Sequence, residues 1–156
     1  MTVTVSDADD LQVRQAERAD LLAVLEIEKA SFPQPWPYEA FTEFLGEPGF
    51  LVALTDGQVV GYVVADVTST HGRSLGHVKD VAVHPDYRGD GVGSVLLTRA
   101  LSELAFQGAD SVKLEVRKGN DGAKRLYQAF DFEPLRQIRG YYEDGEDAII
   151  MVRKLG

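Results

Sequence analysis

The feature that most constrains this chain is the segment His84–Ser94, in which three of the five residues from 89 to 93 are glycine. An apolar, β-branched run, Val78–Val83, precedes it, and residues 92–106 carry apolar side chains at helical spacing. We therefore predict a buried strand, a glycine loop and a helix N-terminus, in that order. Glycines expose the backbone, and the first N–H groups of a helix have no intrahelical partner. This junction predicts a site for a phosphate group.

Two common phosphate-binding motifs do not fit this loop. It lacks the Gly-Lys-Ser/Thr ending of a P-loop, and its glycines alternate instead of following the dinucleotide-binding spacing. The remaining pattern, Arg88-x-x-Gly91-x-Gly93 after a strand, resembles the acetyl-CoA pyrophosphate loop of the GNAT acetyltransferase superfamily. A glycine-rich turn that only caps a core helix is the alternative interpretation.

Length and composition restrict the possibilities further. The 156 residues predict one domain over residues 11–156, after a flexible acidic leader at residues 1–10. Without cysteine the chain forms no disulfide, thiolate metal site or cysteine-acyl intermediate. The three histidines lack metal-ligand spacing, so we expect no metal. The net charge of −9 disfavours nucleic acid and anionic membranes, and no signal peptide or membrane span is evident. We expect a cytoplasmic monomer.

The order of predicted elements indicates the fold class. Strands are predicted at residues 11–16, 50–54, 59–67, 75–83, 112–116, 132–138 and 148–152, and helices at residues 20–32, 38–45, 92–106 and 123–130. This order predicts an α/β fold with a mixed central sheet of about seven strands, flanked by about four helices. In such sheets ligands bind at the carboxyl ends of strands near a crossover, where the glycine loop lies.

Two side chains are candidates for acid–base chemistry. Glu115 lies between Leu114 and Val116 in a predicted strand, so it points to the opposite face of the sheet. It is either a solvent-facing carboxylate or a proton acceptor in a cleft. Tyr127 lies on the apolar side of the last predicted helix, where it either packs in the core or turns its phenol toward a cleft. A phenol with a pKa of about 10 can donate to a departing thiolate, whose thiol has a pKa of about 8.5.

The second half of the chain strengthens the resemblance. Residues 114–132 read Leu-Glu-Val-Arg-x-x-Asn, then Ala-x-x-Leu-Tyr-x-x-Phe-x-Phe, which is similar to the second half of the GNAT fold in RimI-like N-terminal protein acetyltransferases. Residues 140–151 resemble the tail of that subgroup, and Phe32-Pro33-x-Pro35-Trp36 resembles its substrate loop. Together these stretches cover most of the chain from residue 11 onward.

The resemblance implies a GNAT fold, acetyl-CoA as co-substrate, Glu115 as general base and Tyr127 as general acid. The residues that it places at the coenzyme are Val81, Ala82, Val83, Arg88, Gly89, Asp90, Gly91, Val92, Gly93, Ser94, Asn120 and Tyr127. Those that it places around the acceptor are Phe32, Pro33, Tyr141 and Tyr142. Asp90 stands where the family often has a basic or neutral residue, so we expect backbone amides to hold the pyrophosphate.

The predicted reaction is direct acetyl transfer, within a ternary complex, to the α-amino group of a protein N-terminus, for example that of a ribosomal protein. An α-amine has a pKa near 7.7 to 8.0 and loses its proton readily at neutral pH. A lysine side chain has a pKa near 10.4, so removing its proton costs about 3 kcal/mol more. An acetyltransferase for a small-molecule amine or a lysine side chain is the first alternative. A non-catalytic acyl-CoA-binding regulatory module is the second.

Overall fold

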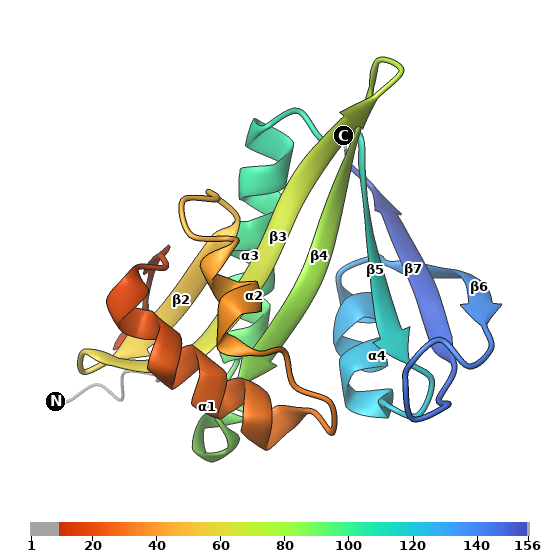
Figure 1. Ribbon diagram of the computed structural model, residues 1–156. Coiled ribbons are helices and arrows are strands. Elements are labelled where there is room, and N and C mark those ends of the chain that lie inside the picture. The colour runs from red at the N-terminus through yellow and green to blue at the C-terminus, as the bar shows by residue number, and fades with distance from the viewer. Residues whose placement is uncertain (1–9, 156) are drawn as a thin grey trace, which may run out of the picture.

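The computed structural model describes residues 10–155, which form one seven-stranded sheet with strand order β1-β2-β3-β4-β5-β7-β6 (Figure 1). The strands are β1 (Gln12–Gln15), β2 (Phe50–Thr55), β3 (Gln58–Thr70), β4 (Arg73–Val83), β5 (Ser111–Arg117), β6 (Glu133–Ile138) and β7 (Ala148–Lys154). The helices are α1 (Leu21–Ser31), α2 (Tyr38–Thr42), α3 (Val92–Phe106) and α4 (Asp121–Ala129). The predicted α/β class and mixed sheet are confirmed. Residues 1–9 of the predicted leader lie outside the described residues.

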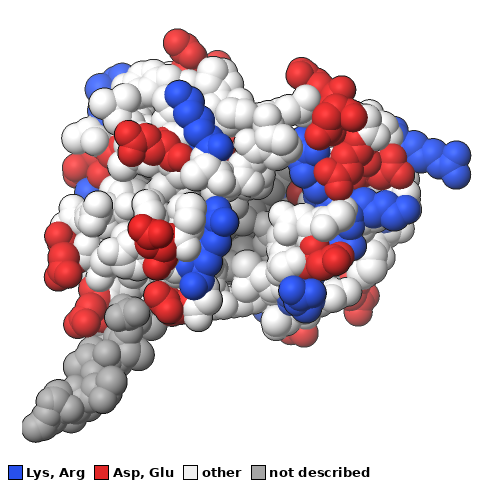
Figure 2. All heavy atoms as spheres, turned by 90° about the horizontal axis from the view of Figure 1, so that it is seen from below, with Lys and Arg blue, Asp and Glu red and all other residues white. Residues whose placement is uncertain are grey.

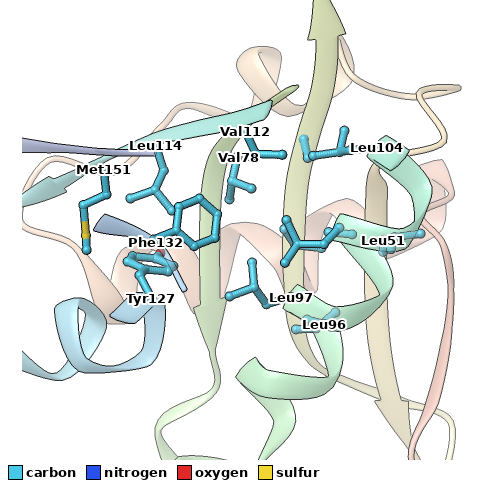
Figure 3. Close-up of a cluster of buried hydrophobic side chains, with 14 of the residues drawn as sticks. Leu51, Val78, Leu96, Leu97, Leu104, Val112, Leu114, Tyr127, Phe132 and Met151 are labelled. Carbon is cyan, nitrogen blue, oxygen red and sulfur yellow. The ribbon is translucent and has the colours of Figure 1, made fainter. Parts of the chain in front are cut away.

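The sheet has a hydrophobic core on each face. Helices α3 and α4 pack against one face, where Leu97 and Leu104 of α3 meet β-strand residues, and Tyr127 of α4 joins the same cluster (Figure 3). Helices α1 and α2 cover the β1–β4 half of the other face, where Phe41 and Phe50 are fully buried. Because each strand alternates its side chains between the faces, both cores draw on the same strands. Across residues 10–155, no helix has the length and apolarity needed to cross a membrane.

Two tight hairpins connect β2 to β3 and β3 to β4. The first turns at Asp56 and Gly57, both with positive φ (50° and 76°), as the Asp-Gly pair predicts. The second turns in the same way at His71 and Gly72, with φ of 52° and 77°. From the sequence, β3 was predicted to end at residue 67 and β4 to begin at residue 75. Both predicted strands were too short, because the His-Gly turn lets the two strands stay paired up to the turn itself.

Helix α2 is shorter than predicted. It ends at Thr42 instead of Leu45, and the amides of Phe44 and Leu45 donate to carbonyls three residues back, at 3.1 and 3.3 Å. Such bonds form a tighter 3-10-like turn instead of a continued α-helix. Gly46, with φ of 93°, then ends the segment. Phe41 and Phe44 still pack against Trp36, so the predicted apolar side is retained.

The sheet opens between β4 and β5, which are the one parallel pair within residues 10–155. These strands pair at three positions, from Leu75 opposite Ser111 to His77 opposite Lys113, and then diverge (Figure 1). Beyond His77, β4 remains paired with β3 and β5 remains paired with β7, so the sheet divides into two halves. The β4 edge from residue 78 to 83 therefore faces the gap without a strand partner. The predicted ligand position at the carboxyl end of this strand coincides with that gap.

Candidate active site

A cleft lies between the diverging strands β4 and β5. Seen from the open end of the gap, the surface is hollowed between the two halves, and Lys and Arg side chains stand on both sides (Figure 2). The cleft is lined by Glu28, Phe32, Gln34, Trp36, Val78, Lys79, Asp80, Val81, Glu115, Val116, Arg117, Asn120, Ala123, Tyr127 and Tyr142. These residues come from α1, the α1–α2 loop, β4, β5, α4 and the β6–β7 loop. Elements far apart in sequence thus meet at one opening.

The cleft brings together about a third of the residues that were predicted for the site. Of the predicted site residues, those that line it are Phe32, Val81, Glu115, Asn120, Tyr127 and Tyr142. Those that do not line it are Pro33, Tyr141, Ala82, Val83 and residues 88–94. Tyr141 borders a neighbouring groove that shares Glu115 with the cleft. Glu115 therefore lies where the two depressions meet.

Glu115 is held by two basic side chains. Its Oε1 lies 2.7 Å from Nε2 of His77, and its Oε2 lies 3.6 Å from Nζ of Lys113. Burial by itself would raise the pKa of Glu115, but the hydrogen bond and charge of His77, together with Lys113, outweigh burial and lower it. The side chain is only 13% exposed, so it is a charged carboxylate in the cleft wall and not a solvent-facing one.

Tyr127 is both a core residue and a cleft residue. It is 6% exposed and packs edge-on against Phe132, with ring centroids 6.0 Å apart. Burial raises its pKa, so the phenol keeps its proton at neutral pH. The core packing that was one interpretation of this residue from the sequence is confirmed. The side chain fills the core and still borders the space between β4 and β5.

The glycine loop forms the N-terminus of α3, as predicted. Gly89 and Gly91 both have φ of 86°, a conformation in which a side chain is strained, and Gly91 is the N-cap. Among residues 10–155 no side chain caps this helix, and its first intrahelical bond runs from Val95 N to Gly91 O. The amides of residues 92–94 thus have no intrahelical acceptor and can donate to an anion.

Two predicted coenzyme residues also have structural roles. The Arg88 guanidinium donates to the carbonyl of Val83 (3.0 Å) and to Oγ of Ser31 (2.9 Å), which ties the glycine loop to β4 and α1. The Arg88 side chain therefore holds the loop in place. Asn120 caps α4, because its Oδ1 accepts from the amide of Ala123 at 3.1 Å.

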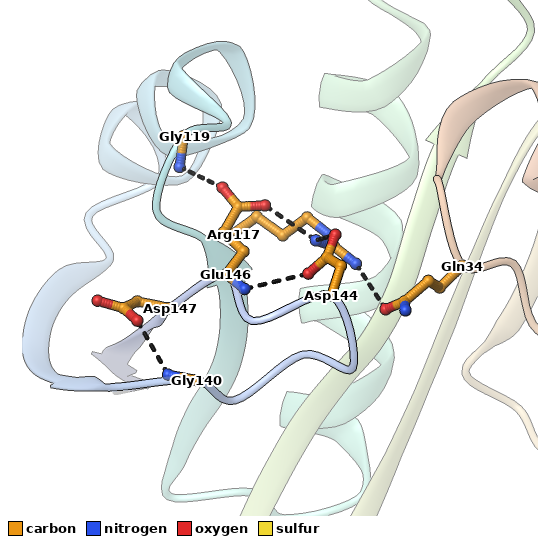
Figure 4. Close-up of polar contacts among 7 residues, drawn as sticks. All are labelled: Gln34, Arg117, Gly119, Gly140, Asp144, Glu146 and Asp147. Carbon is orange, nitrogen blue, oxygen red and sulfur yellow. Dashed lines mark hydrogen bonds and ion pairs between the residues drawn. The ribbon is translucent and has the colours of Figure 1, made fainter.

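Arg117 joins the two loops at the mouth of the cleft. Its Nη1 donates to Asp144 (2.8 Å) and Glu146 (2.9 Å) of the β6–β7 loop, and its Nη2 donates to Gln34 of the α1–α2 loop (3.2 Å; Figure 4). The guanidinium also lies 4.1 Å from the ring centroid of Tyr142. Burial is the main cause that raises the pKa of Tyr142 to about 12. One cation thus ties the α1–α2 loop to the β6–β7 loop.

Replacing Arg117 with methionine should release these loops without removing its aliphatic packing. We expect the KM for an acceptor peptide to rise about tenfold, with little change in acetyl-CoA affinity, because the lost contacts support binding on the acceptor side only. Steady-state kinetics against each substrate, with the exposed Arg99→Met as control, would check this. Equal losses in affinity for both substrates would contradict it.

The sequence did not reveal two carboxyl groups that line the cleft, those of Glu28 and Asp80. It also did not reveal Tyr62, whose buried hydroxyl contacts both of them. A signal was present for Asp80, since Lys79 and Asp80 interrupt the otherwise apolar run Val78–Val83. For Glu28 there was none, because one glutamate among several in an amphipathic helix reads as exposed. Within residues 10–155, no three His, Asp or Glu side chains are grouped closely enough to hold a metal ion.

Known proteins resemble this chain along nearly all of its length. An N-alpha-acetyltransferase of Saccharolobus solfataricus is 34% identical over 157 residues, which covers 94% of each chain. The ribosomal protein bS18-alanine N-acetyltransferase of Escherichia coli is 33% identical over 143 residues, which covers 89% of this chain and 94% of that protein. The crystal structure of Ard1 from Thermoplasma volcanium matches with a TM-score of 0.87 and 30% identity, covering 94% of this chain and 99% of that one.

The open parallel pair, the uncapped glycine loop beside it and these relatives define an acetyl-CoA-dependent N-acetyltransferase. The sequence profile of the acetyltransferase (GNAT) family matches residues 21–132, which is most of the chain. The chain belongs to that family.

Proposed function

We propose that this protein transfers the acetyl group of acetyl-CoA directly to the α-amino group of a protein N-terminus, within a ternary complex. The observation that carries the proposal is the cleft itself, in which Glu115 and Tyr127 line one space between β4 and β5. The printed names of the relatives, an N-alpha-acetyltransferase and a ribosomal-protein alanine N-acetyltransferase, support the same acceptor class.

The coenzyme fits the glycine-loop side of the cleft. The amides of residues 89–94 would hold the diphosphate, because they lie at a helix N-terminus that no side chain caps. The unpaired edge of β4 at residues 81–83 would hold the pantetheine arm through backbone hydrogen bonds, and Asn120 would contact that arm. When bound there, acetyl-CoA supplies the thioester carbonyl that the amine attacks.

The acceptor would approach from the α1–α2 side. Phe32 of the α1–α2 loop and Tyr142 of the β6–β7 loop line the cleft, and Tyr141 borders the neighbouring groove. Together with Pro33, which follows Phe32 in the chain, they would form walls around the first residues of the acceptor. The net charge of −9 suits a cationic acceptor, such as the start of a basic ribosomal protein. These walls favour a peptide over a small-molecule amine, which has no backbone to place between them.

The roles of the two acid–base groups follow from their surroundings. Glu115 stays ionised because His77 and Lys113 hold its pKa low, so it can accept a proton, directly or through water, from the nitrogen once that nitrogen is bonded to the acetyl carbon. Such a nitrogen is far more acidic than a free ammonium, so a weak base suffices. Tyr127 keeps its phenolic proton and can give it to the departing thiolate.

Replacing Tyr127 with phenylalanine should lower kcat about tenfold, while acetyl-CoA affinity remains near that of the parent protein. The effect is modest because a thiolate already leaves readily without a proton. Single-turnover kinetics at saturating substrates would measure it. Tyr38→Phe, on α2 and outside the cleft lining, serves as the matched control. An unchanged kcat in the Tyr127 variant would remove this residue from the acid role.

Mass spectrometry of peptides incubated with the protein and acetyl-CoA tests the acceptor class. The peptides would vary at their first two residues, and each would have a partner with a blocked N-terminus and a free lysine. We expect acetylation of free N-termini only. Modification of the blocked peptides would indicate a lysine acetyltransferase, and acetylation of polyamines alone would indicate a small-molecule enzyme. Coenzyme binding without any product would support the non-catalytic module.

A further inference from the structure

Two carboxyl groups that the mechanism above does not use lie in the wall of the cleft. Glu28 of α1 is 1% exposed and Asp80 of β4 is 9% exposed, and both line the cleft. The buried Tyr62 hydroxyl joins them: it donates to Oε1 of Glu28 and lies 3.5 Å from Oδ2 of Asp80. The other Glu28 oxygen accepts from the amide of Trp36 at 2.9 Å. Helix α1 and strands β3 and β4 thus hold one carboxyl pair beside the α1–α2 loop.

A β-bulge places Asp80 on this side of the sheet. In the β3–β4 ladder Val64 lies opposite Asp80 and Ala65 lies opposite Val78, which leaves Lys79 as an extra residue. Val78 packs in the α3 core, and regular alternation would turn residue 80 the same way. Because of the extra residue, Asp80 instead faces Tyr62 in the α1–α2 core. The bulge therefore directs a carboxyl toward Glu28.

No cation within residues 10–155 neutralises this pair through an ion pair. The adjacent Lys79 turns away, toward Asp66 at 3.8 Å and the Phe44 ring at 5.5 Å. Burying carboxyl groups without a cation is costly, so such pairs are usually neutralised by a proton or by a ligand. Lys79 and Arg117 line the cleft, but within residues 10–155 neither forms an ion pair with Glu28 or Asp80.

Burial, and after it the neighbouring Glu28 carboxyl, raise the pKa of Asp80 well above its ordinary value. The carboxyl of Asp80 therefore exchanges its proton nearer to neutral pH than an exposed carboxyl does. A base is most effective when its pKa lies close to the working pH. In the same cleft Glu115 has the opposite shift and is the weaker base.

We propose that the Glu28–Asp80 pair receives the ammonium group of the acceptor and takes its first proton. The inference deepens the proposed function and rests on it. One N–H bond of the ammonium breaks, its electron pair stays on nitrogen, and an O–H bond forms on the pair. The neutral amine then attacks. The second proton of the nitrogen goes to Glu115, and Tyr127 protonates the thiolate. Of the two protons that the nitrogen loses, one is balanced by the thiol and one passes to solvent.

Other titratable groups also face the cleft or its wall. They are Tyr62, His77, Lys79, Glu115, Arg117, Tyr127 and Tyr142. A change in rate with pH can therefore be assigned to the pair only by comparing variants of the pair with the parent protein at each pH.

The test is the pH dependence of kcat/KM, in Asp80→Asn and Glu28→Gln, for a peptide with a free N-terminus that the parent protein acetylates. Both changes keep the side-chain shape, and glutamine at residue 28 can still accept from the Trp36 amide. Without the pair only the neutral α-amine reacts, which is about a tenth of the peptide at pH 7. We expect a loss of about tenfold at pH 7 and about 100-fold at pH 6, and parent-like values at pH 9.

Thermal unfolding and acetyl-CoA binding of both variants should match those of the parent protein. The control Asp110→Asn changes a carboxyl just before β5, outside the cleft lining, and its kcat/KM should match the parent value at every pH. A loss that is the same at all pH values would indicate a structural role and overturn the inference. Parent-like rates at pH 6 would also overturn it. In both cases the parent protein still acetylates the peptide, so the proposed function survives. A parent protein that acetylates no peptide would overturn both.

Discussion

Replacing Glu115 with glutamine should lower the rate of acetyl transfer by about 100-fold or more, with the fold and acetyl-CoA affinity unchanged. General-base catalysis contributes on the order of 10²–10⁴ in rate, and glutamine cannot accept the proton. Its amide can still contact His77 at the position of Oε1, which lies 2.7 Å from the ring, so the cleft should keep its shape. Single-turnover rates at saturating acetyl-CoA and peptide would measure the effect.

The matched control for Glu115 is Glu133→Gln, an exposed glutamate at the start of β6. It removes the same charge outside the cleft and should transfer acetyl at the parent rate. If Glu115→Gln also does so, this residue is not the base, and the Glu28–Asp80 pair would be left as the proton acceptor of the cleft. Measurements at several pH values distinguish the role of Glu115 from that of the Glu28–Asp80 pair. The loss of rate in Glu115→Gln should persist at pH 9, where the α-amine is already neutral.

Replacing Gly93 with alanine should weaken acetyl-CoA binding by at least about tenfold, or about 1.4 kcal/mol. A Cβ at this position would lie 3.5 Å from Leu126 and 3.7 Å from Val83, which are ordinary contacts, so the protein should tolerate it. The methyl group would occupy the space between α3, α4 and the end of β4, beside the amides that we propose to hold the diphosphate. Calorimetric titration with acetyl-CoA would measure the affinity.

Gly122→Ala is the matched control for Gly93→Ala. It makes the same change in the first turn of α4, where the new methyl group meets nothing within 4 Å. Both variants should be as stable as the parent protein or slightly more so, because alanine favours a helix over glycine by up to about 1 kcal/mol. If both bind acetyl-CoA as the parent protein does, the diphosphate is not held at this loop.

Local patterns were sufficient where neighbours in sequence set the structure. The glycine loop and α3 could be predicted because Gly91 adopts a positive φ next to a helix whose buried leucines recur at regular spacing. The face of Glu115 could be predicted because β5 alternates without interruption, with Leu114 and Val116 buried on either side of it. At the bulge in β4 the alternation of side chains between the two faces is interrupted. Reasoning from alternation therefore did not predict the position of Asp80.

The sequence by itself determined the order of strands and helices, the glycine loop and the face on which Glu115 lies, because these depend on residues within one or two turns of chain. Only the tertiary structure decided which distant groups meet: His77 with Glu115 across 38 residues, and Tyr62 with Glu28 across 34. Those contacts depend on the strand register, on one extra residue in β4 and on the divergence of β4 from β5, all of which arise from packing between segments that are far apart in the chain.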